Sequence, residues 1–240
     1  MLLAVDIGNT NIVIGLFKAD KLVSKLRILS GGRAQVNKIR GGFSSAIISS
    51  VVPRLTRVIA RHLISRYKIR PIIVNWKKIK NLKVKIGNRS RIGVDRLVNA
   101  VAAKSLYGCP LVIIDFGTAT TFCAVDKKGD YLGGAITSGL AISRDVLHER
   151  TAKLPAIEIR RPSRAIGRDT VEAMRSGLFF GYVDMVEGMI KRFKSVIGKR
   201  SKVIATGGLA KLIASGTDKI DVVDQDLTLK GLNMIYKQRS

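Results

Sequence analysis

Two stretches of the chain share one pattern: Leu3-Ala-Val-Asp6-Ile-Gly8-Asn-Thr10 and Val112-Ile-Ile-Asp115-Phe-Gly117-Thr118-Ala. Each contains an apolar run, an aspartate, an apolar residue, a glycine and a hydroxyl side chain. A short apolar run of this kind predicts a buried strand, and each stretch leads into a predicted β-hairpin. Two equivalent units whose aspartates lie 109 residues apart indicate duplicated lobes.

The rest of the chain alternates between patterns typical of strands and of helices, which indicates the α/β class. Strands are expected at Leu2–Val5, Ile12–Phe17, Lys21–Leu29, Ala46–Val52, Pro71–Val74, Leu111–Ile114 and Lys202–Ala205. Helices are expected from Pro53, at Asp95–Leu106, near Leu140–Glu149, at Thr170–Arg192 and at Leu227–Tyr236. A boundary near Tyr107–Pro110 gives an N-terminal lobe of residues 1–108 and a C-terminal lobe of residues 109–240.

Composition favours a cytoplasmic protein that does not enter a membrane. The 240 residues are 46% hydrophobic, enough for a substantial core. Two cysteines, Cys109 and Cys123, make no disulfide framework, which favours a reducing compartment. The first residues lack the basic start of a signal peptide, and no run approaches the roughly 18–20 apolar residues of a membrane helix.

The formal net charge is +26, and most of it comes from one stretch. Between Lys18 and Arg91 the chain has twenty Lys and Arg residues and a single acid, Asp20. Such a field attracts polyanions in a salt-dependent way, so non-specific binding of nucleic acid has to be considered. The same stretch has no RNA-binding aromatic signature and no zinc-finger spacing. A solvated basic surface therefore stays open as the alternative.

The chemistry of Asp-x-Gly after a strand suits a phosphate-binding loop. Glycine lets the backbone approach an anion, and the following N–H and hydroxyl groups donate to phosphate oxygens, while the aspartate acts through a bound cation. Val203-Ile-Ala-Thr206-Gly207-Gly208 adds a strand with paired glycines, against which adenine and ribose can pack. Each pattern alone is commonly a turn. No Walker or Gly-x-Gly-x-x-Gly motif is present, which disfavours the P-loop and Rossmann classes.

Seven segments stand out in order along the chain. They are Asp6-Ile-Gly-Asn-Thr-Asn11, Gly93-Val-Asp95-Arg96-Leu-Val-Asn99-Ala, Asp115-Phe-Gly-Thr-Ala-Thr-Thr121-Phe, Gly133-Gly-Ala-Ile, Glu149-Arg-Thr-Ala-Lys-Leu-Pro155, Thr170-Val-Glu-Ala-Met-Arg-Ser-Gly177 and Asp226-Leu-Thr-Leu-Lys-Gly-Leu232. Together they resemble type III pantothenate kinase. The order of the two loops and the glycine pair is similar to that of the actin-like ATPase and sugar kinase superfamily. The resemblance implies two duplicated actin-like ATPase (ribonuclease H-like) lobes with mixed sheets and a nucleotide cleft between them.

The resemblance also implies an activity: transfer of the ATP γ-phosphate to the primary hydroxyl of pantothenate, giving 4'-phosphopantothenate in the first step of coenzyme A biosynthesis. Asp95 takes the place of the family's proton acceptor, a role that suits a carboxylate beside an attacking alcohol. Arg96 can bind a carboxylate in bidentate fashion, which suits pantothenate. The structural alternative is that Asp95 merely caps the helix it begins.

By the same resemblance, the remaining site residues fall into three groups. Contacts to ATP are expected from Asp6, Ile7, Gly8, Asn9, Thr10, Asn11, Ile12, Val13, Thr118, Gly207 and Gly208. Contacts to pantothenate are expected from Ile86, Gly93, Val94, Asp95 and Arg96, and from Thr170 across a homodimer interface. Asp6 is expected near Mg²⁺, through water, and Asp115 is expected to bind a monovalent cation, K⁺ or NH₄⁺. Thr170 also follows Asp169, which has the spacing of a capping pair with Glu172.

The chain departs from the family pattern at two places. Ile86 lies nine residues before Asp95, where the family usually has a tyrosine that lines the pantothenate pocket. The segment between Arg27 and Ala46 is markedly shorter than expected, and its Gly31-Gly-Arg-Ala loop replaces a helix. Two further hypotheses therefore stay open beside the pantothenate kinase: a nucleic-acid-binding or regulatory protein on this scaffold, and a kinase of another hydroxyl-bearing acid. His62 and His148 are interpreted as structural.

Overall fold

The computed structural model describes residues 1–31, 39 and 41–238, and the chain divides into two compact units. Unit 1 combines Met1–Leu106 with Asp226–Ser240, and unit 2 is Tyr107–Gln225. The division near residue 107 lies close to the expected boundary. The expected C-terminal lobe differs at its far end, because the helix at 227–237 buries its apolar face in unit 1.

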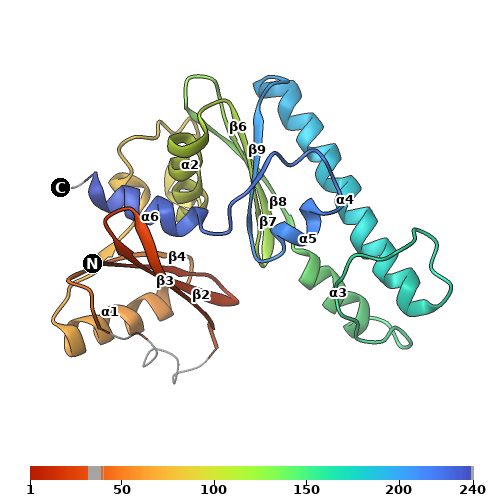
Figure 1. Ribbon diagram of the computed structural model, residues 1–240, viewed down its shortest axis with the longest axis horizontal. Helices are drawn as coiled ribbons and strands as arrows, with labels where there is room; N and C mark the ends of the chain where they lie inside the picture. The colour runs from red at the N-terminus through yellow and green to blue at the C-terminus, as the bar shows by residue number, and fades with distance from the viewer. Residues whose placement is uncertain (32–38, 40, 239–240) are drawn as a thin grey trace. The chain divides into compact units, whose positions relative to one another are not determined.

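Unit 1 is built on a five-stranded mixed sheet in the order β3-β2-β1-β4-β5. Its strands are β1 (Leu2–Ile7), β2 (Asn11–Lys18), β3 (Lys21–Leu29), β4 (Ser45–Ser50) and β5 (Ile72–Ile73). The first three form an antiparallel meander, whereas β4 and β5 run parallel to β1. Helix α1 (Pro53–Tyr67) lies below this sheet in Figure 1, and α6 (Leu227–Lys237) lies above it.

Unit 2 repeats this topology in the order β8-β7-β6-β9-β10. Its strands are β6 (Leu111–Phe116), β7 (Ala119–Val125), β8 (Tyr131–Ser138), β9 (Lys202–Gly207) and β10 (Val222–Val223). Again three strands are antiparallel and two run parallel to the first. The helices are α3 (Leu140–Glu149), α4 (Thr170–Ile197) and α5 (Ala210–Ala214). Phe179, Val183 and Val186 of α4 join the core over this sheet.

The central strands of the two units, β1 and β6, have the same pattern of burial. In each, five residues are buried and only the fifth, Asp6 or Asp115, is half-buried. A strand between two neighbours and covered on both faces needs a continuous apolar run, which explains why both strands were predicted from sequence. The equal strand order and burial confirm the predicted duplication of an α/β unit with mixed sheets.

Helix α2 (Val94–Tyr107) follows two single turns, η2 (Trp76–Lys78) and η3 (Arg89–Arg91). Its buried residues include Leu97, Val98 and Asn99. The predicted helices at 95–106, 140–149 and 227–236 are confirmed to within a residue or so at each end. Within the shortened segment, residues 32–38 and 40 lie outside the described residues, and with them all of the Gly31-Gly-Arg-Ala loop after Gly31. Strand β10 was not predicted.

Candidate active site

The first Asp-x-Gly loop is a tight turn at the end of β1. The Gly8 N–H donates to the Asn11 carbonyl over 2.9 Å, and a Cβ built on Gly8 would lie 3.1 Å from that same oxygen. Ser30, which follows β3, donates its Oγ to the Gly8 carbonyl over 2.7 Å and its N–H to the Thr10 carbonyl over 2.9 Å. The turn is therefore fixed from outside, while Asn9 and Thr10 stay exposed.

Sequence reasoning missed Ser30, because the two hydrogen bonds connect strands that only the fold brings together. Sequence reasoning also missed the hydroxyl of Ser49, which the sheet register places at the end of β4. Asp6 lies beside Ser49 of β4, and the equivalent Asp115 lies beside Thr206 of β9. Ser49 is fully buried, and its Oγ has no hydrogen-bond partner in the described part of the chain.

The second loop lies in unit 2, and two glycines pack against it. Gly139, which precedes α3, donates its N–H to the Thr118 carbonyl over 3.1 Å, and a Cβ there would lie 2.6 Å from the Gly117 carbonyl oxygen. Gly207 ends β9 with φ +94°, and a Cβ there would lie 2.6 Å from Asp115 Oδ1. The fold of unit 2 thus brings Asp115 and the Gly207-Gly208 pair together, as predicted, and adds Gly139 to them.

Asp95 lies in the first turn of α2 in unit 1. Its Oδ1 is buried without a hydrogen-bond partner in the described residues, and a Cβ on Gly93 would lie 2.5 Å from this oxygen. Burial raises the pKa of Asp95, and this effect is opposed by the Arg96 backbone N–H and by the Arg96 charge. A carboxylate that only caps a helix is normally solvated, so an unpartnered buried oxygen favours a chemical role.

The other predicted substrate residues lie in different places. Ile86 is half-buried in the segment that leads to α2 in unit 1. Thr170 is the first residue of α4 in unit 2 and is exposed. The capping interpretation is confirmed there: Asp169 Oδ1 accepts the Glu172 N–H over 2.8 Å, and Glu172 Oε2 accepts the Arg168 N–H over 3.0 Å.

Within the described residues, no group of three or more His, Cys, Asp and Glu side chains is placed to hold a metal ion. His148 Nδ1 lies 2.8 Å from the Leu154 carbonyl oxygen, and the His62 ring packs edge-on against Tyr67, with 5.9 Å between ring centroids. Both contacts support a structural interpretation.

None of the helices described is long and apolar enough to span a bilayer.

Comparison with known proteins places these features in a family. The family model for type III pantothenate kinase matches residues 2–192. A type III pantothenate kinase of Bacillus cytotoxicus is 42% identical over 254 aligned positions, which cover all of this chain and 97% of the relative. These positions exceed the 240 residues of the chain, so the alignment leaves gaps in this sequence.

Solved structures with low sequence identity share the fold over almost the whole chain. A structure from Campylobacter jejuni, described as a Baf family transcriptional activator, superposes with a TM-score of 0.67 at 20% identity, covering 99% of this chain and 98% of that one. The activator of the 2-hydroxyisocaproyl-CoA dehydratase from Clostridium difficile, solved with ADPNP, gives a TM-score of 0.57 at 14% identity, covering 99% and 96%. At this identity the likeness concerns the fold alone.

The family model and the relative show a kinase, which uses ATP, and the duplicated units have the fold of actin-like ATPases and sugar kinases. Within that class, the chain belongs to the type III pantothenate kinase family.

Proposed function

We propose that this chain transfers the γ-phosphoryl group of ATP to the primary hydroxyl of pantothenate and so produces 4'-phosphopantothenate for coenzyme A biosynthesis. The observation that carries the proposal is Asp95 Oδ1, a buried carboxylate oxygen without a partner in the described residues, at the start of a helix. A buried acceptor of this kind is stabilised when a substrate hydroxyl donates to it.

Asp95 is proposed as the proton acceptor. The pantothenate oxygen attacks the γ-phosphorus, its proton passes to Asp95, and the bond from phosphorus to the bridging oxygen of ADP breaks. The pKa of Asp95, raised by burial, brings the carboxylate closer to the basicity that proton transfer from an alcohol needs. Arg96 is proposed to hold the pantothenate carboxylate through its planar guanidinium group. Positioning and electrostatics supply most of the rate in such transfers.

ATP is proposed to bind to the turn of residues 6–13 in unit 1 and to Thr118, Gly207 and Gly208 in unit 2. The exposed N–H and hydroxyl groups of Asn9 and Thr10 suit phosphate oxygens. Thr118 is half-buried, and its carbonyl is held by the Gly139 N–H, so the threonine that faces the nucleotide is preorganised. The backbone at Gly208, which lacks a side chain, is proposed to pack against the base and ribose, next to Gly207, whose Cβ position is filled by Asp115 and Phe116.

The residues present also suit the two cations that the resemblance implies. Asp6 is proposed to hold Mg²⁺ through water, and Asp115 is proposed to bind K⁺ or NH₄⁺ directly. Both are half-buried carboxylates at strand ends, the donor type that hard cations prefer. Mg²⁺, when bound, neutralises charge on the β- and γ-phosphates. Asp115→Asn should remove the preference for K⁺ or NH₄⁺ over Na⁺ while leaving Mg²⁺ dependence intact.

Ile86 is proposed to line the pantothenate pocket as an apolar residue. The loss of one substrate hydrogen bond costs about 0.5–1.5 kcal/mol, which corresponds to a factor of roughly 2–12 in KM. Ile86→Tyr should therefore lower the KM for pantothenate by that factor and leave the KM for ATP unchanged. If the variant instead weakens pantothenate binding, the pocket is suited to a different hydroxyl-bearing acid, and a panel of such acids will identify it.

Thr170 is proposed to reach pantothenate across a homodimer interface, in a protein of the cytoplasm. The test combines light scattering with kinetics. Thr170→Ala should raise the KM for pantothenate but not that for ATP, and Asp169 should keep the helix start in place. A fully active monomer would refute the homodimer interface, and so would an unchanged KM for pantothenate in Thr170→Ala.

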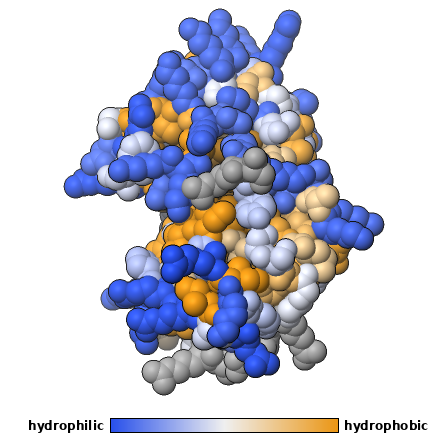
Figure 2. All heavy atoms as spheres, turned by 90° about the vertical axis from the view of Figure 1, so that its left-hand side faces the viewer, coloured by the Kyte–Doolittle hydropathy of each residue, from blue (hydrophilic) through white to orange (hydrophobic). Residues whose placement is uncertain are grey.

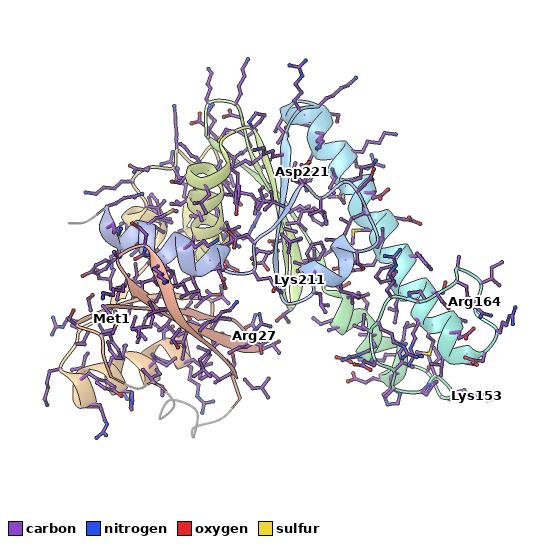
Figure 3. All side chains as sticks on the ribbon, in the orientation of Figure 1. Met1, Arg27, Lys153, Arg164, Lys211 and Asp221 are labelled. Atoms are coloured by element: carbon purple, nitrogen blue, oxygen red, sulfur yellow. The ribbon has the colours of Figure 1, made fainter. Side chains whose placement is uncertain are left out.

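A second candidate function rests on the unequal distribution of charge. Unit 1 carries 25 Lys and Arg residues against four acids, whereas unit 2 carries 18 against 13. Two of the four acids are already paired: Asp20 with Lys237 at 2.6 Å and Asp226 with Lys25 at 2.5 Å. Figure 2 shows hydrophilic residues above and below an apolar band on one face of the molecule. Arg27 of β3, labelled in Figure 3, is one of the exposed cations.

We propose that this surplus binds nucleic acid without sequence preference. Arg54, Arg57 and Arg61 are exposed along one side of α1, which has no acid of its own. Guanidinium groups three and four residues apart on a helix form a row that suits successive phosphates. Binding of a random 30-base DNA should weaken steeply with salt. Changing these three to glutamine should reduce the slope by about one for each phosphate that is no longer neutralised, and Lys127→Gln/Lys128→Gln in unit 2 is the matched control.

The experiment that tests the kinase is ADP release from ATP and Mg²⁺, with and without pantothenate, in K⁺ or NH₄⁺ and in Na⁺. Wild type and Asp95→Asn are run side by side. Turnover that needs pantothenate and falls to a small residual rate in the asparagine variant supports the assignment. ATP binding without pantothenate-dependent turnover in any of these salts would overturn it.

A further inference from the structure

The segment Asp226–Leu232 resembles the family pattern, yet it contains none of the residues proposed for ATP or pantothenate. It begins α6 and belongs to unit 1. Three of its residues, Leu227, Leu229 and Leu232, are buried, which explains the apolar positions as core packing. Asp226, Thr228 and Gly231 need another explanation, and each has a specific contact.

Three contacts, one of them made by Asp226, hold α6 against the strands of unit 1. The Asp226 carboxylate lies 2.5 Å from Lys25 Nζ of β3. Leu229 packs so closely on β2 that a Cβ built on Gly15 would lie 2.8 Å from Leu229 Cδ1. Further along α6, Asn233 Nδ2 donates to the Ala19 carbonyl over 3.0 Å, in the turn between β2 and β3. The helix is therefore fixed to the meander whose first strand carries Asp6.

The other two contacts join α6 to α2, the helix that carries Asp95. Thr228 Oγ1 donates to Asn99 Oδ1 over 2.7 Å. Gly231 lies against the backbone of α2, and a Cβ there would overlap the Val98 carbonyl oxygen. Asn99 is 2% exposed, and asparagine is a poor residue for a helix interior, so its side chain is present for its hydrogen bonds and not for helix stability.

Asn99 lies four residues after Asp95, so the two share one side of α2, one turn apart. The hydrogen bond to Asn99 and the close approach of Gly231 to Val98 together restrain the rotation of α2 about its axis and its position along that axis. Since the first turns of α2 are rigid and packed, a displacement at Asn99 moves Asp95 by a similar distance. A misplacement of about 1 Å at a reacting group can cost on the order of 10²-fold in rate.

We propose that Thr228 is a positioning residue for the phosphoryl transfer: its hydroxyl, through Asn99, sets the location of Asp95 relative to the loop after β1. Asn99 and Gly231 complete the device, the first as the acceptor and the second by allowing the two helices to touch. The inference rests on the proposed kinase function for its kinetic consequence, whereas the mechanical link between α6 and α2 stands on contacts within unit 1.

The test compares Thr228→Val, which keeps the shape and removes the hydroxyl, with Thr228→Ser, which keeps the hydroxyl. The valine variant should lower kcat about tenfold with an unchanged KM for ATP, and the serine variant should restore most of it. Thr56→Val is the matched control, because Thr56 is also a threonine of unit 1 with a hydrogen-bonded hydroxyl, which donates to the Val52 carbonyl over 3.0 Å. A kcat for Thr228→Val no lower than that for Thr56→Val would overturn the proposal.

A double variant separates positioning from general damage. If Thr228 acts through Asp95, Thr228→Val should cause no further loss of residual kcat when Asp95 is already asparagine. An equal loss in both backgrounds would refute the proposed route. Hydrogen exchange gives a readout without activity: amides of residues 94–101 should exchange faster in Thr228→Val than in Thr56→Val. Unchanged exchange would refute the mechanical link, whereas absence of pantothenate-dependent turnover in wild type would refute only the kinase function.

Discussion

Replacing Gly207 by alanine tests the packing of the second phosphate loop. Gly207 adopts φ +94°, and the added methyl carbon would lie 2.6 Å from Asp115 Oδ1 and 2.6 Å from the Phe116 carbonyl oxygen. A left-handed backbone costs an L-residue roughly 1–2 kcal/mol. Overpacking against groups that cannot move freely costs typically about 1–3 kcal/mol, and here one of the two oxygens is backbone.

Together these costs predict a loss of about 3 kcal/mol in the free energy of unfolding, which lowers Tm by roughly 6–12 °C for a chain of this size. The Asp115 carboxylate must also move, so the response to K⁺ or NH₄⁺ should weaken. The assay is thermal unfolding followed by circular dichroism, with turnover measured in each salt on the same preparation.

Gly188→Ala is the matched control, because Gly188 lies inside α4 with open space where the methyl would go. Alanine is the better helix former by about 0.5–1 kcal/mol, so this variant should raise Tm. If Gly207→Ala is as stable as wild type, or if both variants shift Tm in the same direction, the close approach of β9 to Asp115 is incorrect.

Three other single substitutions have defined expected outcomes. Gly93→Ala places a methyl carbon 2.5 Å from Asp95 Oδ1, so the carboxylate must rotate. The kcat should fall on the order of tenfold or more, with little change in Tm. A kcat equal to that of wild type would contradict the close packing of Gly93 on Asp95. Burial raises the pKa of Asp95 above 3.8, so the stabilising contribution of Asp95 is present at lower pH and is lost as pH rises through its pKa in the native state. Asp95→Asn should therefore raise Tm at pH 7 while lowering kcat to a small residual rate. Burial and the Asp224 hydrogen bond raise the pKa of Tyr107 from 10.0 to about 12, so the free energy of unfolding should decline between pH 10 and 12. Tyr107→Phe should flatten that decline, as measured by alkaline denaturation.

Much of the fold could be predicted because its strongest signals are local. The apolar runs before Asp6 and Asp115 predicted buried strands, and their repetition indicated two equivalent lobes. The capping pair at Asp169 and Glu172 likewise depends on neighbours in sequence, and it is present. The candidate site residues at the ends of these strands were predicted for the same reason.

The parts that sequence reasoning missed depend on distant contacts. The pattern of α6 shows an amphipathic helix, but both sheets offer apolar faces, so the pattern could not say which one the helix covers. Ser30 and Gly139 hold their loops by hydrogen bonds to backbone carbonyls that no local pattern identifies. Gly231 carried a hint, because a glycine inside a helix costs stability unless another backbone approaches closely.

Because unit 1 is made of two separate stretches of the chain, it can complete its fold only at the end of protein synthesis. Unit 2 is one uninterrupted stretch, so everything it needs leaves the ribosome together. Unit 1 emerges first, yet the helix that buries Leu227, Leu229 and Leu232 against it is translated only after all of unit 2. The nascent chain therefore carries an uncovered apolar sheet face throughout the translation of unit 2, and this is the interval in which chaperones have most to bind.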